Sequence, residues 1–131
     1  MIRYKKVIIT LSCIVVFLLL GILVIFNQSI EKSKYLVVND VDLSQIKDGQ
    51  YIGEYSIFPV YAEVEVTIKN HDIKKIQVLK HDNGLGSNAE VIKEDIIKQK
   101  SLNVDTISGA TVSSKCIMKA VEYAILNGGD N

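Results

Sequence analysis

The sequence predicts an α+β protein in which an N-terminal transmembrane helix precedes a small antiparallel sheet with helices packed on one face. Three patterns lead to this fold class. Residues 7–26 form an apolar run without a single charge, residues 61–69 alternate between apolar and polar side chains, and apolar residues after residue 87 recur at helical spacing. Strands that precede helices along a chain are typical of an α+β domain.

The apolar run is long enough to cross a membrane. Its 20 residues span ~30 Å as a helix. Arg3, Lys5 and Lys6 precede the run, and positive residues beside a first span favour the cytoplasm. The sequence therefore predicts a single-pass cell-membrane protein with a cytoplasmic tip at 1–6, an anchor at 7–26 and an extracytoplasmic remainder. A cleaved signal peptide is the alternative, but the run is long for one and lacks a small-residue cleavage site.

The composition limits what the rest of the chain is. The 131 residues are 48% hydrophobic with a formal net charge of zero, but three of the 15 basic residues precede the apolar run. Residues 27–131 therefore carry 12 basic and 15 acidic residues, a net charge of −3, which argues against nucleic acid as a partner. Because these 105 residues form one small domain at most, a large two-domain enzyme is excluded. We expect a linker at 27–47, a folded domain at 48–127 and a C-terminal tail at 128–131.

Three strands are expected at the start of the outer domain. Residues 50–57 are rich in aromatic and β-branched side chains and predict a strand, which Phe58-Pro59 ends. Residues 61–69 predict a half-buried strand, and residues 73–80 return as its antiparallel partner. The apolar face of the middle strand consists of Ala62, Val64, Val66 and Ile68. In the linker, residues 35–38 either pair as an edge strand or pack against the domain.

Two helices are expected after the sheet. Ser87 and Glu90 match a capping box that starts a helix continuing to about Lys100. A second helix runs roughly over residues 111–126, and Gly128-Gly129 end it. Cys116, on this helix, is either a redox-active thiol or a small buried residue, and free cysteines favour the second interpretation. Cys13 lies in the apolar run, so the two cysteines are not expected to pair.

The segment before the second helix concentrates hydroxyl groups. Four hydroxyl side chains and one glycine fall within seven residues, namely Ser108, Gly109, Thr111, Ser113 and Ser114. A helix start offers unpaired amides and the positive end of the helix dipole, so this combination is typical of a phosphate site. Plain helix capping is the alternative, with Ser108 as the cap and Asp105 favouring the dipole.

Ser108-Gly109-Ala110-Thr111, with Asp105 six residues before the threonine, resembles the flavinylation motif of the FMN-binding domain family. Asp48–Gly53 resembles the family's opening strand, and His81–Gly86 followed by Ala89 resembles its central loop and helix. The family includes the FMN-carrying C- and G-type subunits of Na+-translocating NADH:quinone reductase and of RNF complexes. This chain is much shorter than those subunits and is similar to the minimal domain.

The resemblance implies a covalent FMN whose phosphate is esterified to Thr111. Because a threonine hydroxyl is a weak nucleophile by itself, the resemblance also implies attachment by a separate Mg-dependent flavin transferase that uses FAD. Asp105 helps to present the motif to this transferase or is only a turn residue. The cofactor-binding residues expected by resemblance are Ser108, Gly109, Ala110, Thr111, Ser113, Ser114, His81, Gly84, Leu85 and Gly86. Helix capping by the serines, turn chemistry for the glycines and strand termination by His81 remain the alternatives. His71 is expected to be a turn residue.

The resulting expectation is a membrane-anchored electron carrier at the extracytoplasmic face rather than an enzyme with its own substrate site. The chain is expected to have no catalytic residue and no metal site, to contact membrane lipid and to exchange electrons with a quinone or a redox protein. Two alternatives remain. One is an FMN-carrying subunit of a larger respiratory complex, and the other is a non-flavinylated extracytoplasmic binding domain.

Overall fold

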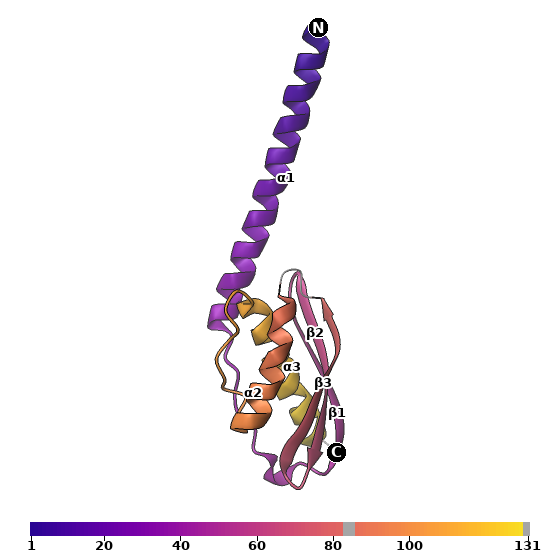
Figure 1. The fold of residues 1–131 in the computed structure, drawn as a ribbon, viewed down its shortest axis with the longest axis vertical. Helices are drawn as coiled ribbons and strands as arrows, with labels where there is room; N and C mark the ends of the chain where they lie inside the picture. Colours follow the sequence, from indigo (N-terminus) through magenta and orange to yellow (C-terminus); the bar gives the residue numbers. More distant parts are fainter. Residues whose placement is uncertain (83–85, 130–131) are drawn as a thin grey trace.

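A computed structural model of the chain describes residues 1–82 and 86–129 and confirms the predicted α+β class. One long helix, α1 (Ile2–Tyr35), extends away from a small domain (Figure 1). The domain contains an antiparallel meander in the order β1 (Gly49–Ile57), β2 (Val60–Lys69) and β3 (Asp72–Asp82). The helices α2 (Ile92–Gln99) and α3 (Thr111–Gly129) pack against the sheet. Two short 3-10 helices, η1 (Leu43–Gln45) and η2 (Ser87–Val91), complete the elements.

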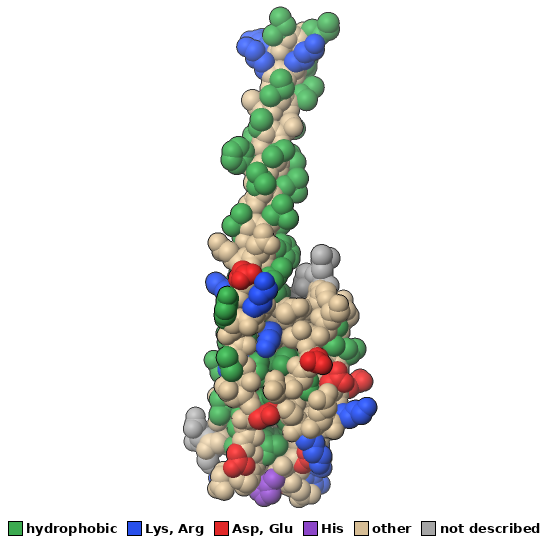
Figure 2. Space-filling model, turned by 90° about the vertical axis from the view of Figure 1, so that its left-hand side faces the viewer, with side chains coloured by type: hydrophobic (Ala, Val, Ile, Leu, Met, Phe, Trp, Pro, Cys, Tyr) green, Lys and Arg blue, Asp and Glu red, His purple; other side chains and the backbone are tan. Residues whose placement is uncertain are grey.

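The helix α1 is compatible with a single-pass membrane anchor. Among the described residues, one helix is long and apolar enough to cross a membrane, and its apolar stretch is not buried by the rest of the chain. Basic side chains gather at its N-terminal tip, and charged side chains return where it meets the domain (Figure 2). Between these ends its surface carries hydrophobic side chains, as contact with lipid requires.

The helix continues nine residues past the predicted span, through the first part of the predicted linker. These residues add about 14 Å of helix. Ser29 and Ser33, one turn apart, are buried against the domain. Because tertiary packing supplies most helix stability, this contact extends the helix where local sequence predicted a polar linker.

The remainder of the predicted linker is held on α3 by side chains. Lys119 Nζ donates to Val37 O at 3.0 Å and pairs with Glu122 Oε2 at 2.8 Å. Glu122 in turn accepts the Asn39 amide at 3.2 Å. Of the two possibilities for residues 35–38, packing against the domain is the one observed, and Val38 is buried. These bonds orient the domain relative to α1.

Replacing Glu122 by alanine should destabilise the domain by about 3–5 kcal/mol, because it leaves the buried Lys119 ammonium and the Asn39 amide without their shared acceptor. The measurement is thermal unfolding of the detergent-solubilised protein. Glu31→Ala, which removes the exposed Glu31–Lys34 pair, is the matched control and should leave the unfolding temperature unchanged. Equal unfolding temperatures of the Glu122→Ala and Glu31→Ala variants would contradict a structural role for the buried Lys119–Glu122 pair.

The sheet buries one face, as the alternation predicts. Ala62, Val64, Val66 and Ile68 are at most 1% exposed. On β1, Gly53 lies directly beneath the backbone of α3 at Ala120 and Ala124. The three small residues therefore let the helix approach the strand closely.

The predicted helix boundaries after the sheet need correction. Gly86, not Ser87, occupies the N-cap position of η2. Within the described residues, no side chain donates or accepts a capping hydrogen bond at this turn. Glu90 Oε1 lies 3.2 Å from His81 Nδ1, so the Glu90 carboxylate is used in a tertiary contact instead of a capping box. At the other end, α3 continues to Gly129, and Gly128 is buried beside the ring of Tyr51.

Candidate functional site

The hydroxyl-rich motif folds into a tight turn that leads directly into α3. The Ala110 amide donates to Ile107 O at 2.9 Å, and Gly109, the third residue of this turn, has φ +76°. Only glycine adopts that backbone conformation without strain, which explains its place in the motif. The Ser114 amide donates to Ala110 O at 2.9 Å. The amides of the three preceding residues, 111–113, therefore point out of the helix start and remain available to an anion.

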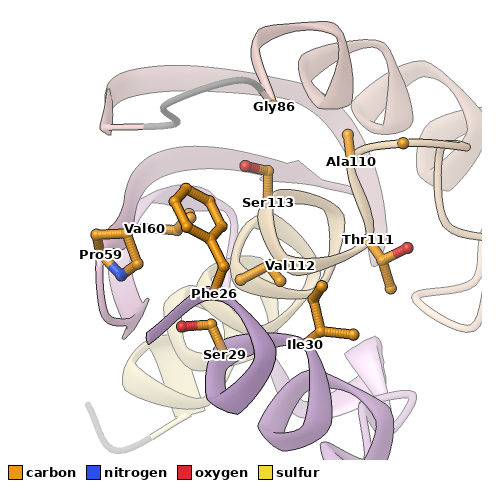
Figure 3. A pocket seen from close by; sticks show the side chains of 11 residues that line it. Phe26, Ser29, Ile30, Pro59, Val60, Gly86, Ala110, Thr111, Val112 and Ser113 are labelled. Carbon is orange, nitrogen blue, oxygen red and sulfur yellow. The ribbon is translucent and has the colours of Figure 1, made fainter. Parts of the chain in front are cut away.

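A pocket with a volume of about 290 Å³ lies beside Thr111. That volume is near the lower end of the ~300–1,000 Å³ typical of small-molecule sites. Three segments and Gly86 enclose it, and their side chains are mainly apolar (Figure 3). The end of α1, the β1–β2 turn and the start of α3 contribute Phe26, Ser29, Ile30, Pro59, Val60, Gly109, Ala110, Thr111, Val112 and Ser113.

Thr111 is half-buried at the first position of α3. Its hydroxyl points away from Phe26 in Figure 3, whereas Ser113 and Val112 lie nearer to the Phe26 ring. The threonine hydroxyl thus lies on the side of the pocket lining away from Phe26, on a residue that is only partly buried. A group attached there has free amides beside it and an apolar pocket next to it.

The structure brings only some of the predicted site residues together. Gly86, Gly109, Ala110, Thr111 and Ser113 line the pocket, whereas Ser108 and Asp105 are exposed outside its lining. Gly84 and Leu85 lie outside the described residues.

Two of the serines have structural positions that differ from the capping prediction. Ala110, not Ser108, is the residue before the helix, so Ser108 as the cap is wrong. Ser114 is fully buried, and its hydroxyl accepts the Ile107 amide at 3.0 Å. The Ser114 side chain therefore stabilises the turn before α3 instead of capping the helix.

His81 is not part of the pocket lining. Its side chain is buried, and Nδ1 lies 3.2 Å from Glu90 Oε1. A contact between His81 and the cofactor therefore stays a prediction. His71 has φ 58° between β2 and β3, as expected for a turn residue.

Sequence reasoning missed the contribution of α1 to the pocket. Phe26 is the last residue of the apolar run, so it was assigned to the lipid-facing span, while Ser29 and Ile30 fell in the predicted linker. The available signal was the pair of small residues Ser29 and Ser33 at one-turn spacing, which marks a packed helix face.

Cys116 is fully buried in α3, which confirms the second interpretation of this residue. Burial raises the pKa of its thiol from an ordinary 9.0 to about 11, although a backbone hydrogen bond with Ile57 partly opposes the effect.

Cys116 should therefore react slowly with maleimide at pH 8, roughly 100-fold more slowly than an exposed cysteine, because the thiolate is the reactive form. The measurement uses a Cys13→Ser background so that one thiol remains. Unfolding in denaturant should restore ordinary reactivity. Rapid labelling of the native protein would show that the Cys116 thiol is accessible. That result would favour the interpretation of Cys116 as a redox-active thiol.

Taken together, the fold and the site define a class: an α+β domain at the end of an apolar helix, with a threonine at a helix start beside an apolar pocket. Residues 60–126, about half of the chain, match the family model described as FMN-binding domain. The chain belongs to the FMN-binding domain family. Membership supports a flavin-binding role in electron transfer with FMN as the cofactor.

The chain is also similar to a curated protein. Over 65 residues it is 37% identical to a urocanate reductase of Eggerthella lenta. The matched segment makes up 47% of this chain but only 11% of the reductase. The similarity therefore concerns one domain of a much larger protein.

Proposed function

We propose that this chain is a single-pass, membrane-anchored flavoprotein that carries electrons at the extracytoplasmic face, with FMN attached to Thr111 through a phosphoester. The observation that carries the proposal is the position of Thr111. It is the first residue of α3, is half-buried in the lining of an apolar pocket, and lies next to amides that precede the first helical hydrogen bond. These groups fit FMN, because the amides suit its phosphate and the pocket suits its aromatic ring.

The attachment reaction requires a partner enzyme. We assign it to a Mg-dependent transferase that uses FAD. The Thr111 oxygen forms a bond to the FMN phosphorus, the bond between the two phosphorus-bearing halves of FAD breaks, AMP leaves, and the threonine proton is released. The helix-start amides and the Ser113 hydroxyl remain beside the new phosphodiester. Asp105 and Ser108, exposed on the approach to Thr111, offer contacts to the transferase.

Covalent attachment matches the proposed location. The basic tip favours a cytoplasmic N-terminus, which supports an extracytoplasmic domain. A dissociated cofactor would be lost by dilution there, whereas a tether maintains a high effective concentration. When bound, FMN accepts and passes on electrons, and the protein supplies position and burial. A quinone or a redox protein supplies or receives the electrons.

The test is co-expression with a competent flavin transferase. The denatured protein should retain flavin fluorescence in a gel, and its intact mass should exceed the polypeptide by FMN minus one water. Expression without the transferase should give neither signal. If the transferase labels a known substrate but not this chain, the chain is instead a non-flavinylated binding domain. Co-purification with quinone-reductase subunits would favour the larger complex over a stand-alone carrier.

Topology is tested by labelling an engineered cysteine in intact cells. Asn103→Cys places a thiol on an exposed position of the segment before α3. In a Cys13→Ser background, an impermeant maleimide should label it without lysis. Labelling only after lysis would place the domain in the cytoplasm and reject the proposed orientation.

A further inference from the structure

The end of α1 forms one wall of the pocket. This helix wall consists of Phe26, Ser29 and Ile30, which line the same cavity as Thr111. In Figure 3 the Phe26 ring extends from α1 towards Ser113 and Val60, and Ile30 lies beside Val112. Because Phe26 ends the charge-free run, the pocket lies where the span leaves the hydrocarbon layer. From Phe26 to Ile30 the wall extends only ~6 Å along the helix axis.

The helix wall and the domain are held together as one unit. The Ser29 hydroxyl donates to Phe58 O in the β1–β2 turn, next to the pocket residue Pro59. Just beyond the helix, Lys115 Nζ donates to Leu36 O at 3.3 Å. Together with the Lys119–Val37 bond, these contacts fix the orientation of the pocket relative to the anchor. A ligand in the pocket consequently has a defined depth relative to the membrane.

We infer that Phe26 and Ile30 are positioning residues that hold the flavin ring against α1 at the level of the lipid headgroups. The inference rests on the proposed attachment of FMN to Thr111. Thr111 lines the pocket at the start of α3, and Phe26 and Ile30 of α1 line the same pocket with apolar side chains, so a ring tethered at Thr111 buries its apolar faces against the helix wall. An aromatic ring packs favourably against Phe26 in offset or edge-on geometry. The anchor is therefore part of the cofactor site as well as a tether.

The depth of the flavin is measured with the full-length flavinylated protein in phosphatidylcholine vesicles. Separate vesicles carry a nitroxide label in the headgroup, high on the acyl chain or near its end. Flavin fluorescence should be quenched about twofold more by the two shallow labels than by the deep one, which is separated from them by most of a ~15 Å leaflet. Equal and negligible quenching by all labels would place the ring away from the membrane and overturn the inference.

The helix wall is tested with Phe26→Ala and Ile30→Ala, singly and together. Iodide quenching per mole of attached flavin should rise about twofold, and fluorescence anisotropy should fall, because the ring loses its apolar cover. Leu20→Ala, an exposed position in the same helix outside the pocket lining, is the matched control. Identical iodide quenching in the wall variants, the control and the wild type would overturn the inference. A gel without a fluorescent wild-type band would instead mean that the proposed attachment itself is wrong.

Discussion

Thr111→Ala should abolish covalent flavin completely, even when an active transferase is co-expressed. Alanine has no oxygen to form the phosphoester, and the hydroxyls that remain nearby lie in other positions. Ser108 is exposed within the turn, Ser113 lines the pocket, and Ser114 is buried and accepts the Ile107 amide. None of them occupies the first position of α3. The mass of the variant should equal that of the polypeptide, and the denatured band should show no flavin fluorescence.

Two further variants separate chemistry from folding. Thr111→Ser keeps the hydroxyl and should retain measurable attachment, whereas Thr106→Ala removes a hydroxyl from the same segment and should leave labelling at the wild-type level. Alanine favours helix formation, so the loss in Thr111→Ala should come without a change in helix content by circular dichroism. Wild-type amounts of attached flavin in Thr111→Ala would contradict the assignment of this residue.

Gly53→Ala should destabilise the domain strongly. A Cβ at this position would lie 2.1 Å from Ala120 O and 2.3 Å from Ala124 N, both backbone atoms of α3. The helix cannot yield locally, since Ala120 and Ala124 are fully buried in the core. Overpacking of this kind typically costs about 1–3 kcal/mol of folding free energy, and a clash with backbone atoms is expected at the upper end of that range. In a domain of this size, the unfolding temperature should therefore fall by more than ~10 °C.

Gly49→Ala is the matched control, because it adds the same methyl to the same strand. Its Cβ would meet the Tyr51 hydroxyl at 3.1 Å, the far end of a side chain that can move. Thermal unfolding followed by near-ultraviolet circular dichroism reports on the packed tyrosines and checks both variants. A Gly53→Ala protein as stable as Gly49→Ala would mean that α3 does not cross β1 this closely.

The elements that sequence reasoning located well are those with a strong local period. The alternation of residues 61–69 placed Ala62 to Ile68 on the buried face, and the structure has them there. The start of α3 was also predicted correctly at Thr111. Both depend on spacing and residue type within one short segment, which the sequence displays directly.

The predictions that failed involve competition from distant residues. Glu90 was assigned to a capping box with Ser87, but His81 of β3 lies beside its carboxylate instead. Residues 27–35 were assigned to a linker because they are polar, yet packing of Ser29 and Ser33 on the domain keeps them helical. A local pattern carries no information about which partner a side chain will meet after folding.

By itself, the sequence determined that this protein has a membrane-length apolar helix, an antiparallel meander and a flavinylation-type motif ending in Thr111 at a helix start. Local periodicity is sufficient for the helix and the meander, whereas the motif is identified by its resemblance to that of a known family. Only the tertiary structure decided where the pocket is and that α1 closes it. Those features depend on contacts such as Ser29 with Phe58 and Lys119 with Val37, which join segments 29 and 82 residues apart. The physical reason is that burial and hydrogen bonding act between neighbours in space, whichever part of the chain supplies them.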